Sequence, residues 1–254
     1  MYAEERHRAI VNRALQQERV SVTELAEEFG VTTETIRRDL DALDHRGLIR
    51  RVHGGAVAAD GFAVLETGLA EREPASAAQK ARIAEAALRY LPTRPGTVLV
   101  DAGTTTGRLA GLLTPSSVQS VVTNSLPAAN QLAANGVPVR LLGGQVRGIT
   151  GATVGAEAVS TLHRLRCDVA FVGTNGISVH HGFSTPDHDE AAVKEAMVHA
   201  ASRVVMLADS SKLGAELLVG FATLSQADVL ITDDGIDQAD VADLRAAGLE
   251  VVIA

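Results

Sequence analysis

A loop of glycine and threonine separates an apolar segment from an amphipathic one in LVDAGTTTGRLAGLL, residues 99–113. Where a helix begins directly after a strand, free backbone N–H groups and hydroxyls converge and can bind an anion. Gly103, Thr104, Thr105 and Thr106 occupy the position where such an anion would bind. These four residues therefore predict an anion-binding loop.

Polar residues also follow the other apolar segments of this part of the chain. Besides DAGTTT at 101–106, these are TNS at 123–125, GG at 143–144, GTNG at 173–176 and DSSK at 209–212. Ligands of open α/β sheets lie outside the carboxyl ends of the strands, so these loops would share one rim. A sugar phosphate suits this rim better than a nucleotide, because GxGxxG and GxxxxGK[ST] are both absent and only 3% of the residues are aromatic.

Charged residues gather in GFSTPDHDEAAVKEAM, residues 182–197. Asp187 or Asp189 can start a helix, on which Glu190 and Lys194 would lie on one face, four residues apart. Taken alone, this pair indicates an ordinary surface ion pair, worth about 0–1 kcal/mol. The nearby histidines match no familiar ligand spacing, so neither a metal nor a cofactor is expected.

Beyond residue 76, apolar strand-like segments alternate with helix-like segments, which predicts a parallel sheet covered by helices on both faces. The expected strands lie within 97–103, 120–125, 138–144, 168–176, 203–211, 228–234 and 249–254. The expected helices lie within 77–91, 106–113, 127–134, 155–163, 189–201 and 238–247. Hydrophobic residues make up 46% of the 254, which allows a substantial core.

Residues 1–57 have a different pattern, that of short helices followed by a hairpin. Ser21-Val22-Thr23-Glu24 has the form of a capping box, Gly30 ends the helix that follows, and Thr32 or Thr33 caps the next one. LIRRVHGGAV, residues 48–57, has the β-branched and Gly-Gly character of a hairpin. Two helices joined around a glycine and followed by a hairpin predict a winged helix-turn-helix.

The second helix of such a pair enters the major groove of DNA. Residues 37–53 carry five Arg and two His, and Arg37 or Arg38 could bind guanine. The candidate DNA contacts are Ser21, Thr32, Thr33, Thr35, Arg37, Arg38, Arg50, Arg51 and His53. The alternative is a solvated helix with surface ion pairs such as Glu34–Arg38.

These patterns predict a DNA-binding domain at 1–57, a linker of mixed charge at 58–76 and an α/β domain at 77–254. No signal peptide is recognisable, and no apolar run approaches the ~20 residues that span a bilayer. Cys167, the single cysteine, is expected to be a buried hydrophobe rather than part of a disulfide. We therefore expect a cytoplasmic protein with no membrane partner, and the net charge of −8 argues against non-specific polyanion binding by the whole chain.

The stretch SVTELAEEFGVTTETIRRDLDALDHRGLIRRVHGGAV, residues 21–57, resembles the DNA-binding head of the DeoR family of bacterial transcription regulators. Downstream, DAGTTT, VVTNS, GTNGIS, STPDHDEAAVK and ADSSKLG resemble that family's effector domain. The resemblance covers nearly the whole chain and implies an effector domain similar in fold to ribose-5-phosphate isomerase and related sugar-phosphate enzymes. It also implies a repressor of sugar-catabolism genes that leaves its operator when a phosphorylated sugar binds.

By this resemblance, the phosphate would meet the Gly103–Thr106 loop. The sugar would be surrounded by Asp101, Asn124, Asn175, Asp187, Glu190 and Lys212. STPDHDEAAVK and the first residues, MYAEERHRAI, look like fructose-operon repressors, which would make fructose 1-phosphate the effector. Of the other two lysines, Lys194 would flank the pocket, whereas Lys80 would either serve the same rim or lie on a solvated helix face, and the second is favoured.

A homo-oligomer is expected, because it would hold two heads at the spacing of the half-sites in double-stranded operator DNA. Two alternatives remain open at this stage. One is an active sugar-phosphate isomerase with a DNA-binding head, in which Glu190 transfers the proton and Lys212 is the electrophilic helper. The other is an activator or dual regulator, since the sign of control depends on where the operator lies.

Overall fold

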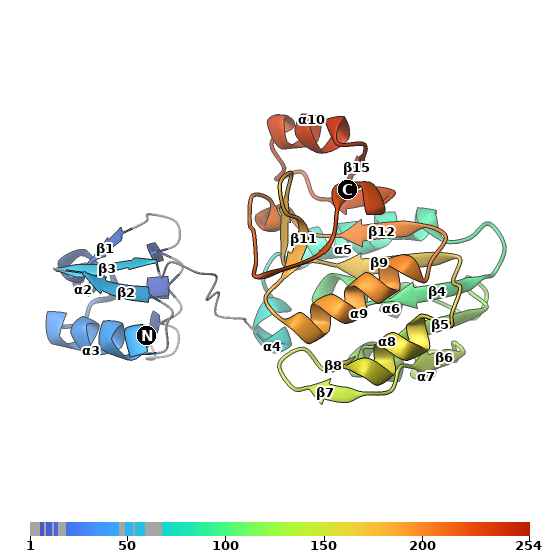
Figure 1. Cartoon of the computed structure of the whole chain (residues 1–254), viewed down its shortest axis with the longest axis horizontal. Coiled ribbons are helices and arrows are strands. Elements are labelled where there is room, and N and C mark those ends of the chain that lie inside the picture. Colours follow the sequence, from blue (N-terminus) through green and yellow to red (C-terminus); the bar gives the residue numbers. More distant parts are fainter. Residues whose placement is uncertain are drawn as a thin grey trace. The chain divides into compact units, whose positions relative to one another are not determined.

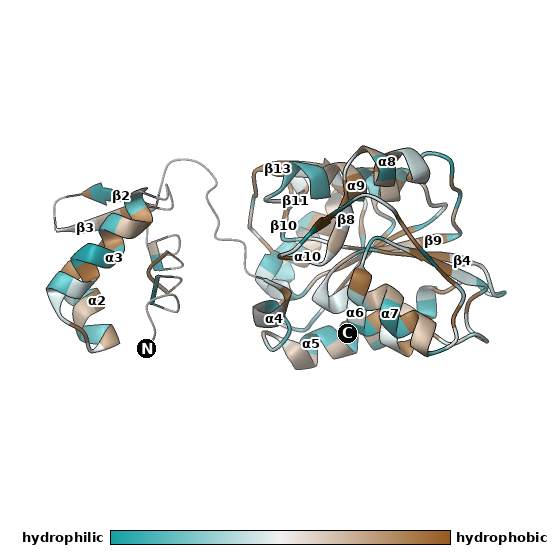
Figure 2. Cartoon of the chain, turned by 90° about the horizontal axis from the view of Figure 1, so that it is seen from below, coloured by the Kyte–Doolittle hydropathy of each residue, from teal (hydrophilic) through white to brown (hydrophobic). Residues whose placement is uncertain are grey.

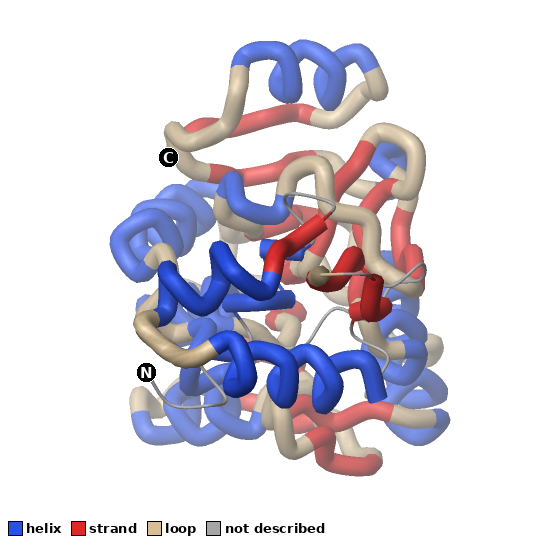
Figure 3. The backbone as a smooth tube through the Cα atoms, turned by 90° about the vertical axis from the view of Figure 1, so that its left-hand side faces the viewer, coloured by secondary structure: helices blue, strands red, loops and turns tan. Residues whose placement is uncertain are grey.

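The computed structural model describes residues 6–7, 9–11, 13–14, 19–45, 49–52, 54–58 and 68–254. The chain divides into two compact units, Met1–Glu66 and Thr67–Ala254 (Figure 1). Their helices and strands can be followed along the backbone in Figure 3. His53, one of the expected DNA contacts, lies outside the described residues.

The first unit, called the head below, packs helices against a small antiparallel sheet. Its labelled helices are α2 (Val22–Phe29) and α3 (Thr33–His45), and its strands are β1 (Arg19–Ser21), β2 (Ile49–Val52) and β3 (Gly55–Ala58), in the order β1-β3-β2. The described residues among 6–14 are also helical. Ile36, Leu40 and Leu43 of α3 are buried in a core shared with Ile10 and Leu25. This arrangement is the expected winged helix-turn-helix, and only the pairing of β1 with β3 was not predicted.

Side-chain caps and a glycine set the turn between the two helices of the head. The Ser21 hydroxyl accepts a hydrogen bond from the N–H of Thr23 at 3.3 Å, at the start of α2. Gly30 ends α2 with φ 63° and ψ 36°, in the left-handed region that favours glycine. The Thr32 hydroxyl then accepts from the N–H of Thr35 at 3.2 Å, so Thr32 caps α3.

A buried carboxylate of α3 holds the first helical residues against this helix. Asp39 is 6% exposed, and its Oδ2 atom accepts from Nε of Arg6 at 2.5 Å. Nε2 of His7 lies 2.9 Å from Oδ1 of the same carboxylate. Hydrogen bonding to Asp39 raises the pKa of Arg6, although burial opposes the shift. The neighbours Arg37 and Arg38 therefore face outward while Asp39 faces the core.

The second unit is built on a seven-stranded parallel sheet. Its order is β15-β14-β12-β9-β4-β5-β6. The strands are β4 (Thr97–Val100), β5 (Ser120–Thr123), β6 (Val139–Leu141), β9 (Val169–Gly173), β12 (Val204–Leu207), β14 (Val229–Thr232) and β15 (Glu250–Ile253). Each neighbouring pair is parallel. All seven strand segments expected from the sequence are in this sheet.

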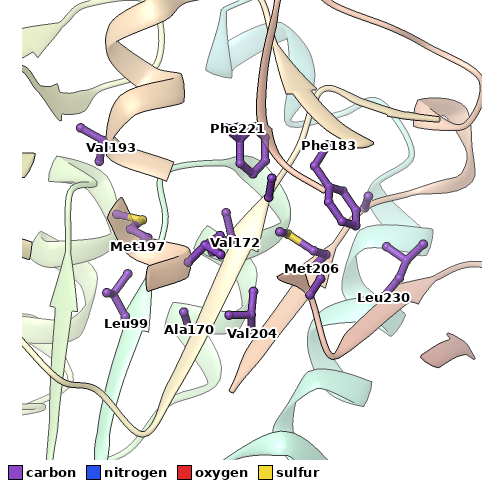
Figure 4. Packing of buried hydrophobic residues seen from close by; sticks show 14 of the residues in the cluster. Leu99, Ala170, Val172, Phe183, Val193, Met197, Val204, Met206, Phe221 and Leu230 are labelled. Carbon is purple, nitrogen blue, oxygen red and sulfur yellow. The ribbon is translucent and has the colours of Figure 1, made fainter. Parts of the chain in front are cut away.

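Alternate residues of these strands fill two separate cores. Leu99, Ala170 and Met206 point to the core on one face, part of which is seen in Figure 4, whereas Val100 and Phe171 point to the core on the other. Helices α8 (Ala156–Leu162), α9 (His188–His199) and α10 (Gln238–Ala246) contribute to the first core, and α5 (Ala77–Ala87), α6 (Thr104–Leu112) and α7 (Leu126–Ala134) to the second. In Figure 2, α8 and α9 lie on one side of β4 and β9, and α5, α6 and α7 on the other. This double burial explains the uninterrupted apolar runs.

Shorter elements surround the sheet. They are the pair β7 (Gln145–Arg147) and β8 (Ala152–Val154), the antiparallel sheet of β10 (Gly176–Ser178), β11 (Gly182–Thr185) and β13 (Val219–Ala222), and the 3-10 turns Leu88–Tyr90, Ser210–Lys212 and Leu224–Gln226. None of the helices within the described ranges is long and apolar enough to cross a membrane.

The expected linker 58–76 is ordered in its second part, which belongs to the second unit. Residues Leu69–Arg72 form helix α4, and a turn over 73–76 leads into α5. The N–H of Leu69 donates to the carbonyl of Ile149 at 3.1 Å, which fastens α4 to the turn between β7 and β8. A segment of four helical residues is too short to show a periodic pattern in the sequence.

Asp39→Ala should destabilise the head, because it removes the carboxylate that neutralises the buried Arg6. We expect the opening free energy of the α3 amides to fall by about 3 kcal/mol, measured by native-state hydrogen exchange of the full chain. Glu34→Ala, at an exposed position of the same helix, is the control and should change this free energy by less than about 0.5 kcal/mol. Equal effects of the two substitutions would contradict a structural role for the Asp39 cluster.

Candidate functional site

A cavity of about 190 Å³ lies at the carboxyl ends of β4, β9 and β12. The sheet changes direction here, since the chain runs from β4 to β5 and β6 on one side and then returns to β9 on the other. Such a switch point is where open α/β sheets bind ligands. The cavity is lined by Leu69, Arg72, Ala75, Ser76, Lys80, Ala102, Gly103, Thr104, Thr105, Thr106, Thr150, Gly173, Thr174, Asn175, Glu190, Lys194, Leu207, Ala208, Asp209, Ser211 and Lys212.

The start of helix α6 forms one wall of this cavity. Gly103 is the N-cap, and in the first intrahelical hydrogen bond the N–H of Gly107 donates to the carbonyl of Gly103. The N–H groups of the first turn therefore have no partner within the helix, and this end of the helix faces the cavity. The hydroxyl of Thr106 is fully buried and has no hydrogen-bond partner among the described residues. An anion at this position would satisfy both kinds of donor.

Lys80 lies in the cavity wall and not on a solvated face as expected from the sequence. It is 4% exposed, and its ammonium donates to the carbonyl of Arg72 at 2.7 Å and to the carbonyl of Ala75. Asp209 is the nearest carboxylate, with Oδ2 at 4.0 Å from Nζ. The spacing of apolar residues in the sequence of α5 predicts one buried face. It does not predict that this face also borders a cavity.

The cations around Lys80 exceed the anions that compensate them. Burial lowers the pKa of Lys80, the charges of Lys212 and Arg72 add to the shift, and Asp209 and Glu73 oppose it, although Glu73 is itself paired with Arg108. Within the described ranges, neither Lys212 nor Arg72 forms an ion pair. The surroundings of Lys80 are therefore short of negative charge.

Glu190 and Lys194 do not form the surface ion pair that their spacing indicates. Both side chains are buried, and Lys194 pairs with Asp101 instead. The Lys194 ammonium also donates to the carbonyl of Gly173 at 2.9 Å, and Oδ2 of Asp101 accepts from the N–H of Gly173 at 3.0 Å. This buried pair joins the loops that follow β4 and β9.

Glu190 is held by the turn between β7 and β8. Its Oε1 atom accepts from the hydroxyl of Thr150 at 2.6 Å and from Nη1 of Arg147 at 3.2 Å. Arg147 also pairs with Asp187 at 3.2 Å, and the Asp187 carboxylate accepts from the N–H of Glu190 at 2.9 Å at the start of α9. The carboxylate that faces the cavity is thus fixed from two sides.

The structure brings most of the expected effector residues together. Those that line the cavity are Gly103, Thr104, Thr105, Thr106, Asn175, Glu190 and Lys212. Three others lie behind it: Asp101 in its pair with Lys194, Asn124 accepting from the N–H of Ala102 at 2.8 Å, and Asp187 at the start of α9. The loops 123–125 and 143–144 do not line the cavity.

Several lining residues were not among the expected ones. They are chiefly Arg72, Lys80, Thr150, Thr174, Asp209 and Ser211, whereas Lys194 was expected beside the pocket. Thr174, Asp209 and Ser211 stand in the strand-end segments that predicted the rim, so their positions carried a signal. Arg72 and Thr150 belong to short irregular segments that no sequence pattern connects with the sheet.

On the head, the two arginines of α3 point away from its core. The side chains of Arg37 and Arg38 are 55% and 78% exposed. Glu34 contacts both, at 3.8 Å from Nη1 of Arg37 and 3.3 Å from Nε of Arg38. The surface pairs weighed as an alternative are therefore present, but they leave both guanidinium groups accessible.

The other expected DNA contacts lie around α3. Thr32 and Thr33 are exposed at its start, where Thr35 is half-buried, and Ser21 is half-buried at the start of α2. Arg50 is exposed on β2. Arg51 pairs with Asp41 of α3, and its Nη1 donates to the carbonyl of Arg37 at 3.4 Å. Arg51 thus fastens the hairpin to α3.

A winged head joined to a parallel-sheet domain with a polar cavity at its switch point defines a class of protein, the transcriptional regulators with a sensor domain. Residues 6–61 match the family model of the DeoR-like helix-turn-helix domain, and residues 75–234 match that of the DeoR C terminal sensor domain. The chain belongs to the DeoR family of transcriptional regulators.

Full-length relatives agree with this assignment. The chain is 39% identical to the HTH-type transcriptional regulator GlpR of Haloferax volcanii, over 99% of this chain and 98% of that protein. It is 34% identical to FruR of Bacillus subtilis, an uncharacterized HTH-type transcriptional regulator, over 92% of each chain. It is 32% identical to the glycerol-3-phosphate regulon repressor of Escherichia coli K12, over 90% of each chain. The chain is accordingly a regulator and not an enzyme, which removes the isomerase alternative.

Among solved structures, the chain is similar to ribose 5-phosphate isomerase A from Neisseria gonorrhoeae, with 17% identity over 54% of each chain and a TM-score of 0.41. A similarity at this level adds nothing to the parallel-sheet architecture described above. In the described part of the chain, no group of three or more His, Cys, Asp or Glu residues is placed to hold a metal ion.

Thr106→Val should weaken phosphate binding while making the domain more stable. The substitution removes a buried hydroxyl without a partner, so the free energy of unfolding should rise by about 1 kcal/mol. Affinity for inorganic phosphate should fall by about tenfold, because a hydrogen bond to a charged group is lost. Urea unfolding and calorimetric titration of the full chain measure the two effects.

Thr232→Val is the matched control. Thr232 is a buried threonine of β14 whose hydroxyl also has no partner within the described ranges, and it does not line the cavity. The control should stabilise the chain to a similar degree and leave phosphate affinity unchanged. The same phosphate affinity in both variants would exclude the Thr106 hydroxyl from the site.

Proposed function

We propose that the chain is a repressor of a sugar-catabolism operon, and that a phosphorylated sugar bound in the cavity releases it from operator DNA. The observation that carries this proposal is the number of donors and cations among the residues that line the cavity. The charges of Arg72 and Lys212 act on Lys80, and the start of α6 with the unpartnered hydroxyl of Thr106 lines the same cavity. A phosphate dianion supplies the missing negative charge and accepts from all of them.

Other residues that line the cavity suit the hydroxyls of a sugar. Glu190 can accept hydrogen bonds, and Asn175 and Thr174 offer an amide and a hydroxyl in the loop after β9. Among the described residues, few apolar and no aromatic side chains line the cavity, so these residues offer a nucleotide base nothing to stack on. The ligand best matched to both groups of residues is a small sugar or polyol with one phosphate group.

Two effectors lead the candidates. Fructose 1-phosphate is favoured by the STPDHDEAAVK tract, in which Asp187 and Glu190 of the site lie. Glycerol 3-phosphate is suggested by the printed name of the regulon repressor from Escherichia coli. A thermal-shift panel of phosphorylated sugars and polyols with the full chain ranks them, because a ligand that binds only the folded state raises its stability.

DNA binding would follow the geometry of other helix-turn-helix proteins. The start of α3 would enter the major groove, with Arg37 or Arg38 on a guanine and the hydroxyls of Ser21, Thr32, Thr33 and Thr35 on phosphates. Arg50 would contact the backbone, and the same role for His53 stays a prediction. A homo-oligomer in the cytoplasm would place two heads on the half-sites of one operator.

Gel-shift titration tests the coupling between effector binding and operator release. The operator is first selected from random duplexes with the full chain. A saturating effector should move the protein from mostly bound to mostly free, which requires about 5.5 kcal/mol of differential affinity for a change from 99:1 to 1:99.

Lys212→Gln should need about tenfold more effector for the same release, because one uncompensated cation is lost. Unchanged operator affinity with millimolar amounts of every ligand of the panel would refute the release mechanism. A reporter gene behind the same operator distinguishes repression from activation.

Arg37→Ala or Arg38→Ala should weaken operator binding and relax its base preference. The loss of a bidentate contact to guanine costs about 1–3 kcal/mol at that base pair. Effector affinity should not change, because these residues lie in the other unit. Arg82→Ala removes the same charge from the second unit and serves as control. If both head variants bind the selected operator as tightly as the control does, α3 does not read the bases through these arginines.

A further inference from the structure

Helix α4 is held to the second unit at three points. The N–H of Leu69 donates to the carbonyl of Ile149, and the carboxylate of Glu73 pairs with Nη2 of Arg108 at 2.6 Å. The third point is Lys80, whose ammonium donates to the carbonyls of Arg72 and Ala75. In the sequence, α4 follows residues 59–67, which join the two units covalently.

Two of these points depend on groups that also line the cavity. Lys80 is one of the cations that line it. Ile149 precedes Thr150, which also lines the cavity and whose hydroxyl donates to Glu190. A ligand that forms hydrogen bonds with Lys80 or Thr150 therefore affects a contact that holds α4 in place.

The turn after α4 is strained. Ser76 has φ 52° and ψ 36°, a left-handed conformation that residues other than glycine adopt at a cost in free energy. Ser76 comes directly after Ala75, the carbonyl of which Lys80 binds. The hydrogen bonds of Lys80 thus help to hold the turn in a conformation that it would otherwise leave.

We propose that Lys80 transmits occupancy of the cavity to α4 by exchanging the carbonyls of Arg72 and Ala75 for the phosphate of the ligand. The two carbonyls use two of the three N–H donors of the ammonium, so a phosphate first accepts from the third. Because a charged acceptor attracts an ammonium more strongly than a carbonyl does, the phosphate then draws Nζ away from the two carbonyls. The turn at Ser76 then relaxes, and α4 changes its position in the second unit. This inference rests on the proposed function, because it assumes that a phosphorylated ligand binds in the cavity.

Amide hydrogen exchange of residues 69–76, measured in the full chain, tests whether Lys80 changes its hydrogen-bond partners when a ligand binds. The N–H groups of Leu69, Arg72 and Glu73 are hydrogen-bonded in α4 and report on it. Saturating fructose 1-phosphate, or inorganic phosphate as the simplest probe, should raise their exchange rate by about tenfold in the wild-type chain. In Lys80→Gln, exchange should be fast without ligand and should not respond to it.

Lys212→Gln is the matched control, because it removes another cation that lines the cavity without touching α4. It should require more ligand but show the full rise in exchange at saturation. Ser76→Gly changes no charge and removes the strain, so it should slow the exchange and raise the ligand concentration needed to release operator DNA.

The possible failures are distinguishable. If no phosphorylated ligand of the panel binds the wild-type chain or releases it from operator, the proposed function itself fails. If ligands bind and release the operator while exchange of residues 69–76 stays constant, Lys80 does not act on α4. The same conclusion follows if Lys80→Gln and Lys212→Gln respond alike at saturation.

Discussion

The change of direction at β4 is the constraint on which the second unit depends. With β5 on one side of this strand and β9 on the other, the chain must leave the sheet edge along two diverging routes, and a gap remains between them. Because all seven strands are parallel, their polar carboxyl ends collect at this gap. The buried Asp101–Lys194 pair joins its two sides. Lys194 therefore has a structural role, while Lys80 and Lys212 stay available for a ligand.

The main sheet could be predicted from the sequence because its strands are buried on both faces. Their apolar runs, such as TVLV and VVML, need no alternation to be recognised, and glycines or polar residues end each one. The pairs β7–β8 and β10–β11 were missed, since strands of three or four residues among glycines resemble loops. Helix α4 was missed for the same reason, and the segment around it was interpreted as part of a linker.

The site could be predicted in part, and the errors have a common cause. Position at a strand end shows that a residue is near the cavity, but not where its side chain points. Asn124 turns back to the N–H of Ala102, and Asp187 caps its own helix, so both support the wall from behind. Lys80 was misplaced in the opposite sense. Its spacing to Ile83 and Ala84 puts it on the buried face of α5, but a charged side chain at such a position favours an exposed interpretation until its carbonyl partners are known.

All three lysines of this sequence line one cavity. Two of them, Lys80 and Lys194, are buried, and Lys212 is partly accessible to solvent. Side-chain primary amines are thereby confined to a single place in a molecule whose surface cations are otherwise guanidinium groups. Among the side chains, an acylating reagent applied to the folded protein would consequently attach mainly at Lys212, and acylation at this residue would report on whether the cavity is filled.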